Sequence, residues 1–292
     1  MSRVFIFNFH RVSDEHSPAF PPIPQKTFER ILRFLNRRFI IIPQEELLTK
    51  LQTSTHKDFC VLTFDDGYAD FVNCALPLLE KYKLPSTLHV VTEVASTGKM
   101  FWTQRLNKIV ESYSQIHLPI EHSAFNKIYT MKNDKEVEMT ALEIYLQLLG
   151  NPEREFIIND LSKAIHDSIQ ETKMLLWKDI VNLPRDFVSI GSHTHTHNNL
   201  MNLSINEIKV ELTKSYNMIK ENVGIAPLSI AYPNGQYNDS INELAKEVGY
   251  KIYYTCNGCK NTLEQKDLFH RANLYNRQYW KNYLKIKMWE YR

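Results

Sequence analysis

The chain has 292 residues, enough for one large α/β domain or two smaller ones with a substantial core. Charged residues make up 23% of it and the formal net charge is +2, so the composition gives no support for a nucleic-acid partner. It contains neither a signal-peptide pattern after Met1 nor an apolar run near the ~18 residues that span a membrane, which favours a cytoplasmic location.

Short apolar runs recur along the chain and are typical of buried strands in a parallel sheet. They occupy residues 4–9, 39–42, 59–64, 86–91, 187–190, 228–232 and 251–255. Segments with helical periodicity lie between most of these runs. Alternating strands and helices predict a parallel sheet with right-handed crossovers. About seven such strands would close into a deformed (β/α) barrel, with an open doubly wound sheet as the alternative.

Local signals predict where several helices begin and end. Phe28, Ile31, Leu32 and Leu35 share one helix face. The pair Ser204 and Glu207 forms a capping-box sequence at the start of a later helix. Asp239 is predicted as the N-cap of the next helix and Gly249 as its C-terminal cap. Pro77 predicts a kink or a restart in the helix that follows Asp70.

One long stretch, residues 103–186, lacks a clear strand signal. Apolar spacing predicts one helix around residues 142–149 and another over 156–169. We interpret the stretch as a helical insertion within a single domain that spans residues 1–292. It would serve as a lid, as a substrate wall or as a passive packing element.

Polar residues follow four of the predicted strands. His10 ends the first run, Asp65 and Asp66 end the third, His193 follows the fifth, and residues 232–235 end the sixth. In parallel α/β folds the catalytic groups gather at the carboxyl ends of strands. We therefore expect these four segments to converge on one site.

Two of these segments carry the side chains of a metal-dependent hydrolase. His193 and His197 would share one face if the backbone between them were helical. Two imidazoles and one carboxylate can hold a divalent metal and leave a position open for water. The second carboxylate of the pair Asp65 and Asp66 could then accept a proton. His195 points elsewhere on either helical or extended spacing, so we expect a supporting or exposed role for it.

Three motifs resemble those of a known family. They are Thr-Phe-Asp-Asp-Gly at 63–67, Ser-His-Thr-His-Thr-His at 192–197 and Ala-Tyr-Pro-Asn-Gly at 231–235. Together they resemble the NodB-type polysaccharide deacetylases, carbohydrate esterase family 4, over residues 4–275 apart from the helical stretch. The resemblance implies a deformed (β/α) barrel and metal-dependent removal of acetyl groups from N-acetyl sugars.

The resemblance also implies roles for individual residues. Asp65 would be the general base, and Asp66, His193 and His197 would be the metal ligands. The backbone N–H of Tyr232 would stabilise the oxyanion. Zinc is the expected metal, with cobalt, nickel or manganese able to replace it.

The N-terminal segment Phe-His-Arg-Val at 9–12 is similar to that of the circularly permuted branch, which includes poly-N-acetylglucosamine deacetylases. In that branch this histidine, here His10, is the general acid, and His270 is the competing residue. The third motif has Ala231 where many members carry an arginine that pairs with the catalytic Asp. Arg271 could supply that charge and keep Asp65 ionised.

We therefore expect an N-deacetylase whose partner is a glycan that contains N-acetylhexosamine. Two alternatives stay open: a metal-dependent amidohydrolase of a small non-glycan amide, and a glycan-binding protein without catalysis. The sequence does not distinguish a polymer from a lipid-linked oligosaccharide. The latter substrate would associate a cytoplasmic enzyme with a membrane. The oligomeric state is also left open.

Overall fold

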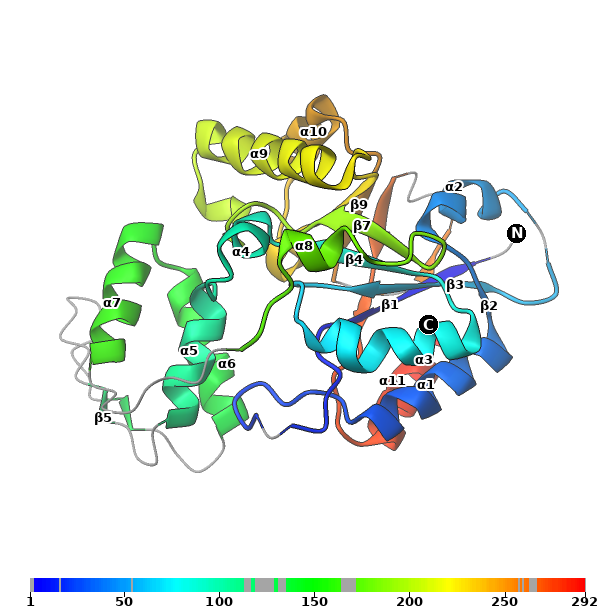
Figure 1. Cartoon of the computed structure of the whole chain (residues 1–292), viewed down its shortest axis with the longest axis horizontal. Coiled ribbons are helices and arrows are strands. Elements are labelled where there is room, and N and C mark those ends of the chain that lie inside the picture. The colour runs from blue at the N-terminus through cyan, green and yellow to red at the C-terminus, as the bar shows by residue number, and fades with distance from the viewer. Residues whose placement is uncertain are drawn as a thin grey trace. The chain divides into compact units, whose positions relative to one another are not determined.

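The computed structural model describes residues 3–15, 17–53, 55–112, 117–118, 129–130, 135–163, 172–256, 258, 260–262 and 267–291. The chain forms two compact units. The first comprises Met1–Glu15, Pro22–Lys99 and Lys173–Arg292, and the second comprises His16–Pro21 and Met100–Thr172. Figure 1 follows the chain from the N-terminus in blue to the C-terminus in red.

The first unit is built on a mostly parallel sheet that forms a nearly closed barrel, as the sequence predicted. Neighbouring strands follow the order β10, β1, β3, β4, β7, β8, β9 and β11. The longer ones are β1 (Val4–Phe9), β3 (Phe59–Phe64), β4 (Ser86–Val90), β7 (Val188–Ser192), β8 (Ser229–Ala231) and β9 (Ile252–Thr255). Every residue of β1, β3 and β4 is buried, which explains why their sequences are near-continuous apolar runs.

One short segment brings the two ends of the sheet together. β11 (Leu268–His270) pairs in parallel with β9, and β12 (Ala272–Asn273) pairs in parallel with β1. Arg271 lies between them, and its N–H donates to the carbonyl oxygen of Thr255 at 2.8 Å. Leu274 N–H donates to the carbonyl oxygen of Asn8 at 2.8 Å. The chain thus changes strand partner at Arg271.

The predicted strand set differs from the structure in three places. The run at 39–42 forms only the two-residue β2 (Ile40–Ile41), which pairs with the start of β3 at the edge of the sheet. β10 (Lys260–Asn261) pairs with β1 in the antiparallel direction. It was not predicted, and neither was the segment of β11 and β12. Their polar and charged residues interrupt the apolar pattern on which the prediction rested.

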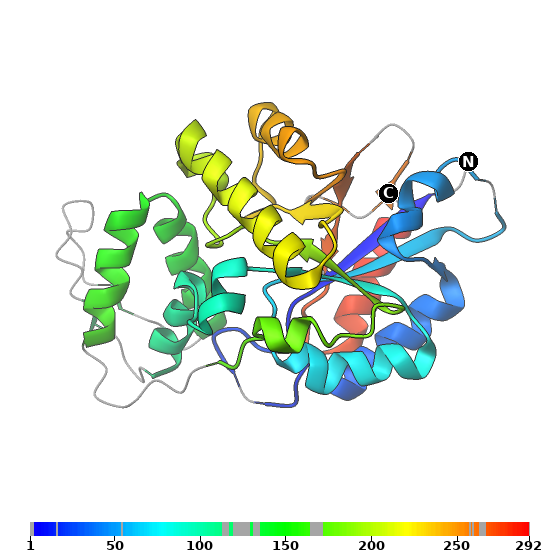
Figure 2. The same ribbon diagram turned by 45° about the horizontal axis from the view of Figure 1, so that its top comes forward.

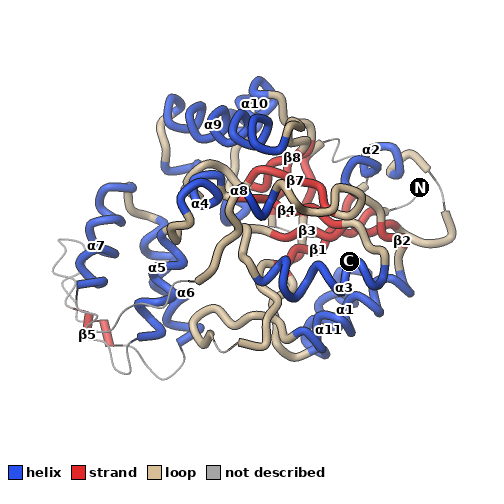
Figure 3. The backbone as a smooth tube through the Cα atoms, viewed as in Figure 1, coloured by secondary structure: helices blue, strands red, loops and turns tan. Residues whose placement is uncertain are grey.

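Helices surround this sheet. Figure 3 shows α1, α3 and α11 along one side of the strands and α9 and α10 along the other, and Figure 2 shows the same grouping from a second direction. Their bounds are α1 (Gln25–Arg38), α2 (Leu47–Lys50), α3 (Leu76–Tyr82), α4 (Thr92–Thr97), α8 (Trp177–Ile180), α9 (Ile205–Val223), α10 (Asp239–Val248) and α11 (Tyr279–Tyr291).

The helix signals are mostly confirmed. The four predicted residues of α1 are all buried, and the Ser204–Glu207 capping box is present on α9. Gly249 ends α10 with a φ of 122°. The N-cap of α10 is Asn238 rather than Asp239, because the Asn238 side chain accepts from Ile241 N–H at 2.9 Å. A π-helix over Phe71–Ala75 precedes α3, so the helix restarts next to Pro77.

Aromatic rings join α1 to the strands that carry the site. Phe9 on β1 stacks on Phe64 of β3 with ring centroids 5.2 Å apart. Phe28 of α1 meets both rings edge-on, at 5.2 and 5.9 Å. Each such buried ring contributes roughly 1.5–3 kcal/mol to stability. This packing fixes the ends of β1 and β3 directly before His10 and Asp65.

The second unit is a small helical cluster with its own apolar core. It contains α5 (Trp102–Ser112), α6 (Lys135–Gln147) and α7 (Asn151–Lys163), and its buried side chains include Leu106, Leu142 and Ile158. A two-stranded antiparallel pair, β5 (His117–Leu118) and β6 (Tyr129–Thr130), was not predicted. Residues 164–169 of the second predicted helix lie outside the described residues.

The boundary of this unit differs from the predicted insertion. The residues from Lys173 onward belong to the first unit. There, Leu175 N–H donates to the carbonyl oxygen of Gly67 at 2.8 Å. That both units form one domain stays a prediction. Within the described residues, no helix combines the length and the apolar character that crossing a bilayer requires.

Candidate active site

Three buried side chains form a cluster of metal-ligand type at the carboxyl end of the sheet. Asp66 follows β3, and His193 and His197 follow β7. Asp66 Oδ1 lies 3.4 Å from Nε2 of His193 and 3.4 Å from Nε2 of His197. The three ligand atoms lie within 4.8 Å of one another. The structure thus brings together the three residues for which the resemblance implied metal binding.

The geometry and chemistry of this cluster fit a divalent cation. His193 Nδ1 lies 2.8 Å from the carbonyl oxygen of Ala231, which can only accept a hydrogen bond. Nδ1 therefore carries the proton, and a neutral His193 presents the lone pair of Nε2 to Asp66 Oδ1. Asp66 Oδ1 is buried and has no hydrogen-bond donor among the described residues. Tetrahedral Zn²⁺ bonded at about 2.1 Å would hold its ligand atoms about 3.4 Å apart.

The backbone of the cluster is irregular rather than helical. Asp66 has a φ of 75°, Thr194 of 65° and His197 of 59°, all in the left-handed region. For Thr194, a β-branched residue, this conformation is unusual and costs of order 1–3 kcal/mol. The condition of a helical backbone between His193 and His197 is therefore not met. Two left-handed residues turn the chain so that both rings reach Asp66.

Neighbouring helices hold this loop in place. Glu211, buried on α9, accepts hydrogen bonds from the N–H groups of His195 and Thr196, each at 2.9 Å, and from the Thr196 hydroxyl. Burial raises the pKa of Glu211, although these hydrogen bonds oppose the shift. From α4, the N–H of Glu93 donates to the carbonyl oxygen of His195 at 2.9 Å. No sequence signal marked Glu211, because it lies on an otherwise ordinary amphipathic helix.

His195 does not face the cluster. Its Nδ1 lies 2.9 Å from the hydroxyl of Thr92, and the residue is buried. Burial, together with the charge of Lys214, lowers its pKa to about 4. Its ring thus joins the loop to the start of α4, which is a supporting role rather than an exposed one.

Asp65 is held by a second, separate set of contacts. Its carboxylate makes a two-pronged ion pair with Arg271, with Oδ1 2.9 Å from Nη1 and Oδ2 2.8 Å from Nη2. Asn8 Nδ2 donates to Oδ2 at 2.8 Å, and His89 Nδ1 lies 3.2 Å from Oδ1. Burial alone would raise the pKa of Asp65, but the charges of Arg271 and His193, together with the contact to His89, outweigh it and hold the pKa well below its usual range. Asp65 is therefore a buried, ionised carboxylate.

Asn8 and His89 were missed by the sequence analysis. Both lie inside strand runs that are otherwise apolar, and both are fully buried. Burial lowers the pKa of His89 to about 4, so the ring is neutral near pH 7. Its other nitrogen, Nε2, lies 3.0 Å from the Ser229 hydroxyl. A Cβ at Gly191 would come within 2.3 Å of this ring, so Gly191 leaves the space that His89 fills. The sequence signal that could have identified Asn8 and His89 was their polarity within runs that are otherwise apolar.

The two candidate acids differ in their surroundings. Burial opposes the ionisation of Asp66, but several interactions nevertheless lower the pKa of Asp66. The charge of His10 is one of them, so His10 lies close to the metal-ligand cluster. His270 neighbours Arg271 in an extended segment, and successive side chains there point to opposite faces. Arg271 reaches Asp65, so His270 points to the other face of the sheet. Its backbone is bound by the Asn261 side chain at 2.8 and 2.9 Å.

The expected oxyanion donor needs correction. The N–H of Tyr232 donates to the carbonyl oxygen of Tyr254 at 3.0 Å, so a sheet hydrogen bond already uses it. Pro233 has no N–H, and Gly235 N–H donates to the carbonyl oxygen of Tyr232 at 2.8 Å. Asn234 N–H has no acceptor among the described residues, and Asn234 has a φ of 58°. Within this turn, Asn234 is the residue whose N–H is available to a ligand.

The Glu211 contacts lead to a testable prediction. Glu211→Ala would leave two buried N–H groups without an acceptor, so we expect a stability loss of about 2–4 kcal/mol and a 10- to 100-fold weaker metal affinity. Glu211→Gln keeps one oxygen for the N–H groups and should retain most of both. Competition with a chromophoric chelator measures the affinity. Glu221→Ala, on the exposed face of α9, is the control. Equal affinity in all three variants would contradict the role of Glu211.

The chain is similar to known deacetylases over most of its length. The family model for "Polysaccharide deacetylase" matches residues 52–253. YxkH of Bacillus subtilis (strain 168) is 34% identical over 89 residues, which are 30% of this chain and 31% of that protein. The chain thus matches about a third of the length of that relative.

Solved structures have the same fold. The Streptococcus pyogenes deacetylase PplD in complex with acetate superposes with a TM-score of 0.65 at 18% identity, over 97% of each chain. IcaB from Ammonifex degensii superposes with a TM-score of 0.63 at 14% identity, over 99% of this chain and 97% of that one. Since the family model covers more than half of the residues and the fold agrees, the chain belongs to the polysaccharide deacetylase family.

Proposed function

We propose that this protein is a metal-dependent hydrolase that removes N-acetyl groups from a polysaccharide or oligosaccharide containing N-acetylhexosamine. The observation that carries the proposal is the pairing of two carboxylates with different surroundings. Asp66 faces two imidazoles, and Asp65 faces a guanidinium. Adjacent residues of the same type are thereby suited to different tasks, metal binding for Asp66 and proton transfer for Asp65.

Each group has a task in the proposed reaction. Asp66, His193 and His197 hold the divalent metal, with zinc expected. When bound, the metal supplies Lewis-acid chemistry at the acetyl carbonyl and makes water more acidic. Asp65 accepts the proton of the attacking water, and Arg271 keeps Asp65 ionised for that step. The N–H of Asn234 donates to the oxyanion. His10 then protonates the leaving sugar amine, and acetate is released.

Acetate release from chito-oligosaccharides tests the proposal directly. We expect release that stops with a chelator and returns when Zn²⁺, Co²⁺, Ni²⁺ or Mn²⁺ is added back. A parallel series of small acetamides distinguishes a glycan deacetylase from an amidohydrolase of small amides. Release that a chelator leaves unchanged would refute the metal-dependent reaction. Binding of the oligosaccharide without any release, in the metal-loaded protein, would instead favour a glycan-binding protein.

Metal content tests the ligand assignment separately. His193→Ala should reduce the bound metal from about one ion per chain towards none, because it removes one of three ligand atoms. His195→Ala is the matched control, since its ring is directed to Thr92 and the metal should stay bound. Elemental analysis after dialysis gives the count. A His193→Ala protein that keeps its metal would exclude this histidine as a ligand.

Separate alanine variants of His10 and His270 test which histidine is the general acid. We expect His10→Ala to lower kcat by about 10²–10⁴-fold, the usual contribution of a positioned general acid. His270→Ala should leave kcat little changed, because its side chain lies on the other face of the sheet from Arg271. If only His270→Ala loses activity, the assignment is wrong.

A further inference from the structure

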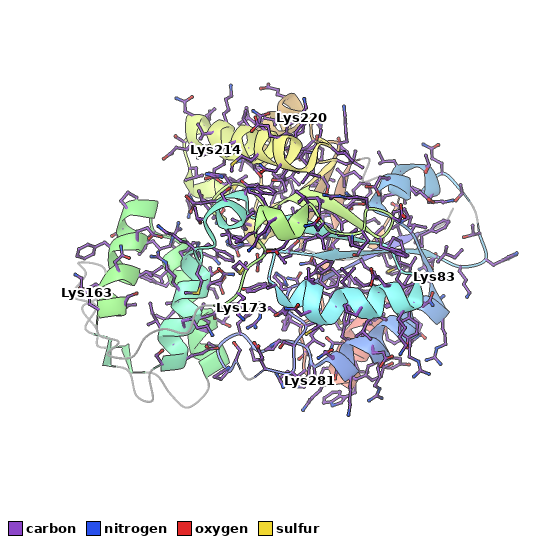
Figure 4. All side chains as sticks on the ribbon, viewed as in Figure 1. Lys83, Lys163, Lys173, Lys214, Lys220 and Lys281 are labelled. Carbon is purple, nitrogen blue, oxygen red and sulfur yellow. The ribbon has the colours of Figure 1, made fainter. Side chains whose placement is uncertain are left out.

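The outer face of α11 carries a stripe of exposed apolar side chains. Trp280, Leu284, Met288 and Tyr291 recur at helical spacing, and their exposed fractions are 55%, 55%, 42% and 86%. Such positions on a surface helix are usually polar. Lys281, on the same helix, places its amine 5.7 Å from the Trp280 ring. Figure 4 shows Lys281 at the outer edge of the molecule.

The outer face of α1 carries a second stripe, and it is basic. Lys26, Arg30, Arg33 and Arg37 are all exposed and recur with the same helical spacing. They lie on the opposite side of α1 from its buried residues, Phe28, Ile31, Leu32 and Leu35.

The two stripes lie next to each other on one surface. Arg30 of α1 stacks over the ring of Tyr279 at 4.2 Å, and Phe34 meets Tyr283 with ring centroids 5.1 Å apart. Further along, Arg38 Nε pairs with Glu290 Oε1 at 2.7 Å. Contacts that advance along both sequences together mean that the helices run parallel. Since both bury their opposite sides, their outer faces form one surface, which we call the α1/α11 face.

Charge is concentrated on these two helices. α1 has five basic residues and one acidic residue, Glu29, and α11 has three lysines and one acidic residue, Glu290. Glu29 is bonded to Lys81 and Tyr82, and Glu290 is paired with Arg38 and Lys287. The two helices therefore hold a formal charge of +6 in a chain whose net charge is only +2.

We propose that the α1/α11 face binds the surface of an anionic lipid membrane. An apolar stripe that includes Trp, next to a row of Arg and Lys, is the composition of helices that lie in the membrane interface. The apolar side chains would enter the boundary between headgroups and acyl chains, and the basic side chains would contact lipid phosphates. This inference does not depend on the proposed reaction.

Co-sedimentation with vesicles tests the inference on the full chain. We expect binding to vesicles of phosphatidylcholine with 30% phosphatidylglycerol (about one lipid in three anionic), weaker binding to phosphatidylcholine alone, and weaker binding as salt rises. Arg33→Glu with Arg37→Glu should weaken binding at least 25-fold, since each basic side chain near the surface contributes about fivefold. Trp280→Ser with Leu284→Ser should weaken it about tenfold or more, since burying an apolar side chain this large is worth well over 1 kcal/mol.

The control variants make the same kinds of substitution on another face of the protein. Lys209→Glu with Lys220→Glu, and Val210→Ser with Ile225→Ser, replace exposed residues on or beside α9. Both control proteins should bind vesicles like the unchanged chain, and thermal unfolding checks that all variants fold.

Three results would overturn the inference. The first is vesicle binding that the controls weaken as much as the α1/α11 variants. The second is binding that the Arg variants abolish and the Trp280 and Leu284 variants leave intact, which would indicate a polyanion other than a bilayer. The third is a dimer that the Trp280 and Leu284 variants dissociate, without vesicle binding by the unchanged chain, which would assign the face to a second copy.

Discussion

Replacing Asp65 by Asn is expected to reduce kcat by about 10³-fold or more while the protein still binds metal. The change removes the proposed base and leaves Asp66, His193 and His197 in place. Loss of a general base alone costs about 10²–10⁴-fold. Because the Asp65 carboxylate also balances the buried Arg271 charge, the effect should lie towards the upper end of that range. Acetate release and elemental analysis on the same preparation measure both quantities.

Folding has to be measured beside activity in this variant. The neutral amide would leave the guanidinium of Arg271 buried without a carboxylate, and breaking a buried ion pair costs about 3–5 kcal/mol. Urea unfolding identifies a loss of activity that is only a loss of structure. Asp66→Asn is the matched comparison, because it should lose metal and activity together. Full activity in Asp65→Asn, with metal bound, would rule out Asp65 as the base.

The second large effect is expected from Arg271→Met. The substitution leaves the Asp65 carboxylate buried beside Asn8 and His89 without its guanidinium partner. We expect a loss of about 3–5 kcal/mol in the free energy of unfolding at pH 7. Arg3→Met breaks the half-exposed pair with Asp58 and should cost no more than about 1 kcal/mol.

In Arg271→Met, the contribution of Asp65 to folding stability should depend on pH in the opposite direction from that in the unchanged chain. In the unchanged chain the pKa of Asp65 lies below its unfolded value of about 3.9, so its stabilising contribution is present above that pH and is lost as pH falls. Without Arg271, burial dominates and raises the pKa of Asp65 above its unfolded value. The contribution is then present below that pH and is lost as pH rises.

The stability difference between Arg271→Met and the unchanged chain should therefore be larger at pH 7 than at pH 4. The acid limb of the pH profile of kcat should also move to higher pH. Equal stability differences at both pH values would contradict the proposed coupling of Arg271 to Asp65.

The barrel and the ligand cluster were predictable because their signals are local. Apolar runs such as 59–64 mark buried strands, and Asp66, His193 and His197 stand directly at or after strand ends. Asn8 and His89 were missed because a single polar residue in an apolar run does not change its period. The N–H of Tyr232, rather than that of Asn234, was expected to bind the oxyanion because the sequence does not reveal which N–H groups the sheet already uses. Glu211 was missed because it contacts the loop at His195 and Thr196 from α9, a helix whose sequence carries no motif of a functional site.

The change of strand partner at Arg271 has a consequence for folding during synthesis. The guanidinium meets a carboxylate 206 positions earlier in the chain, so this contact forms only after most of the polypeptide has left the ribosome. Closing so long a loop is entropically costly and slow compared with pairing of neighbouring strands. β1, β3 and β4 can pair while Asp65 still lacks its counter-charge. We therefore expect the buried ion pair of Asp65 and Arg271 to form late in folding, and a chain that stops before Arg271 cannot form it.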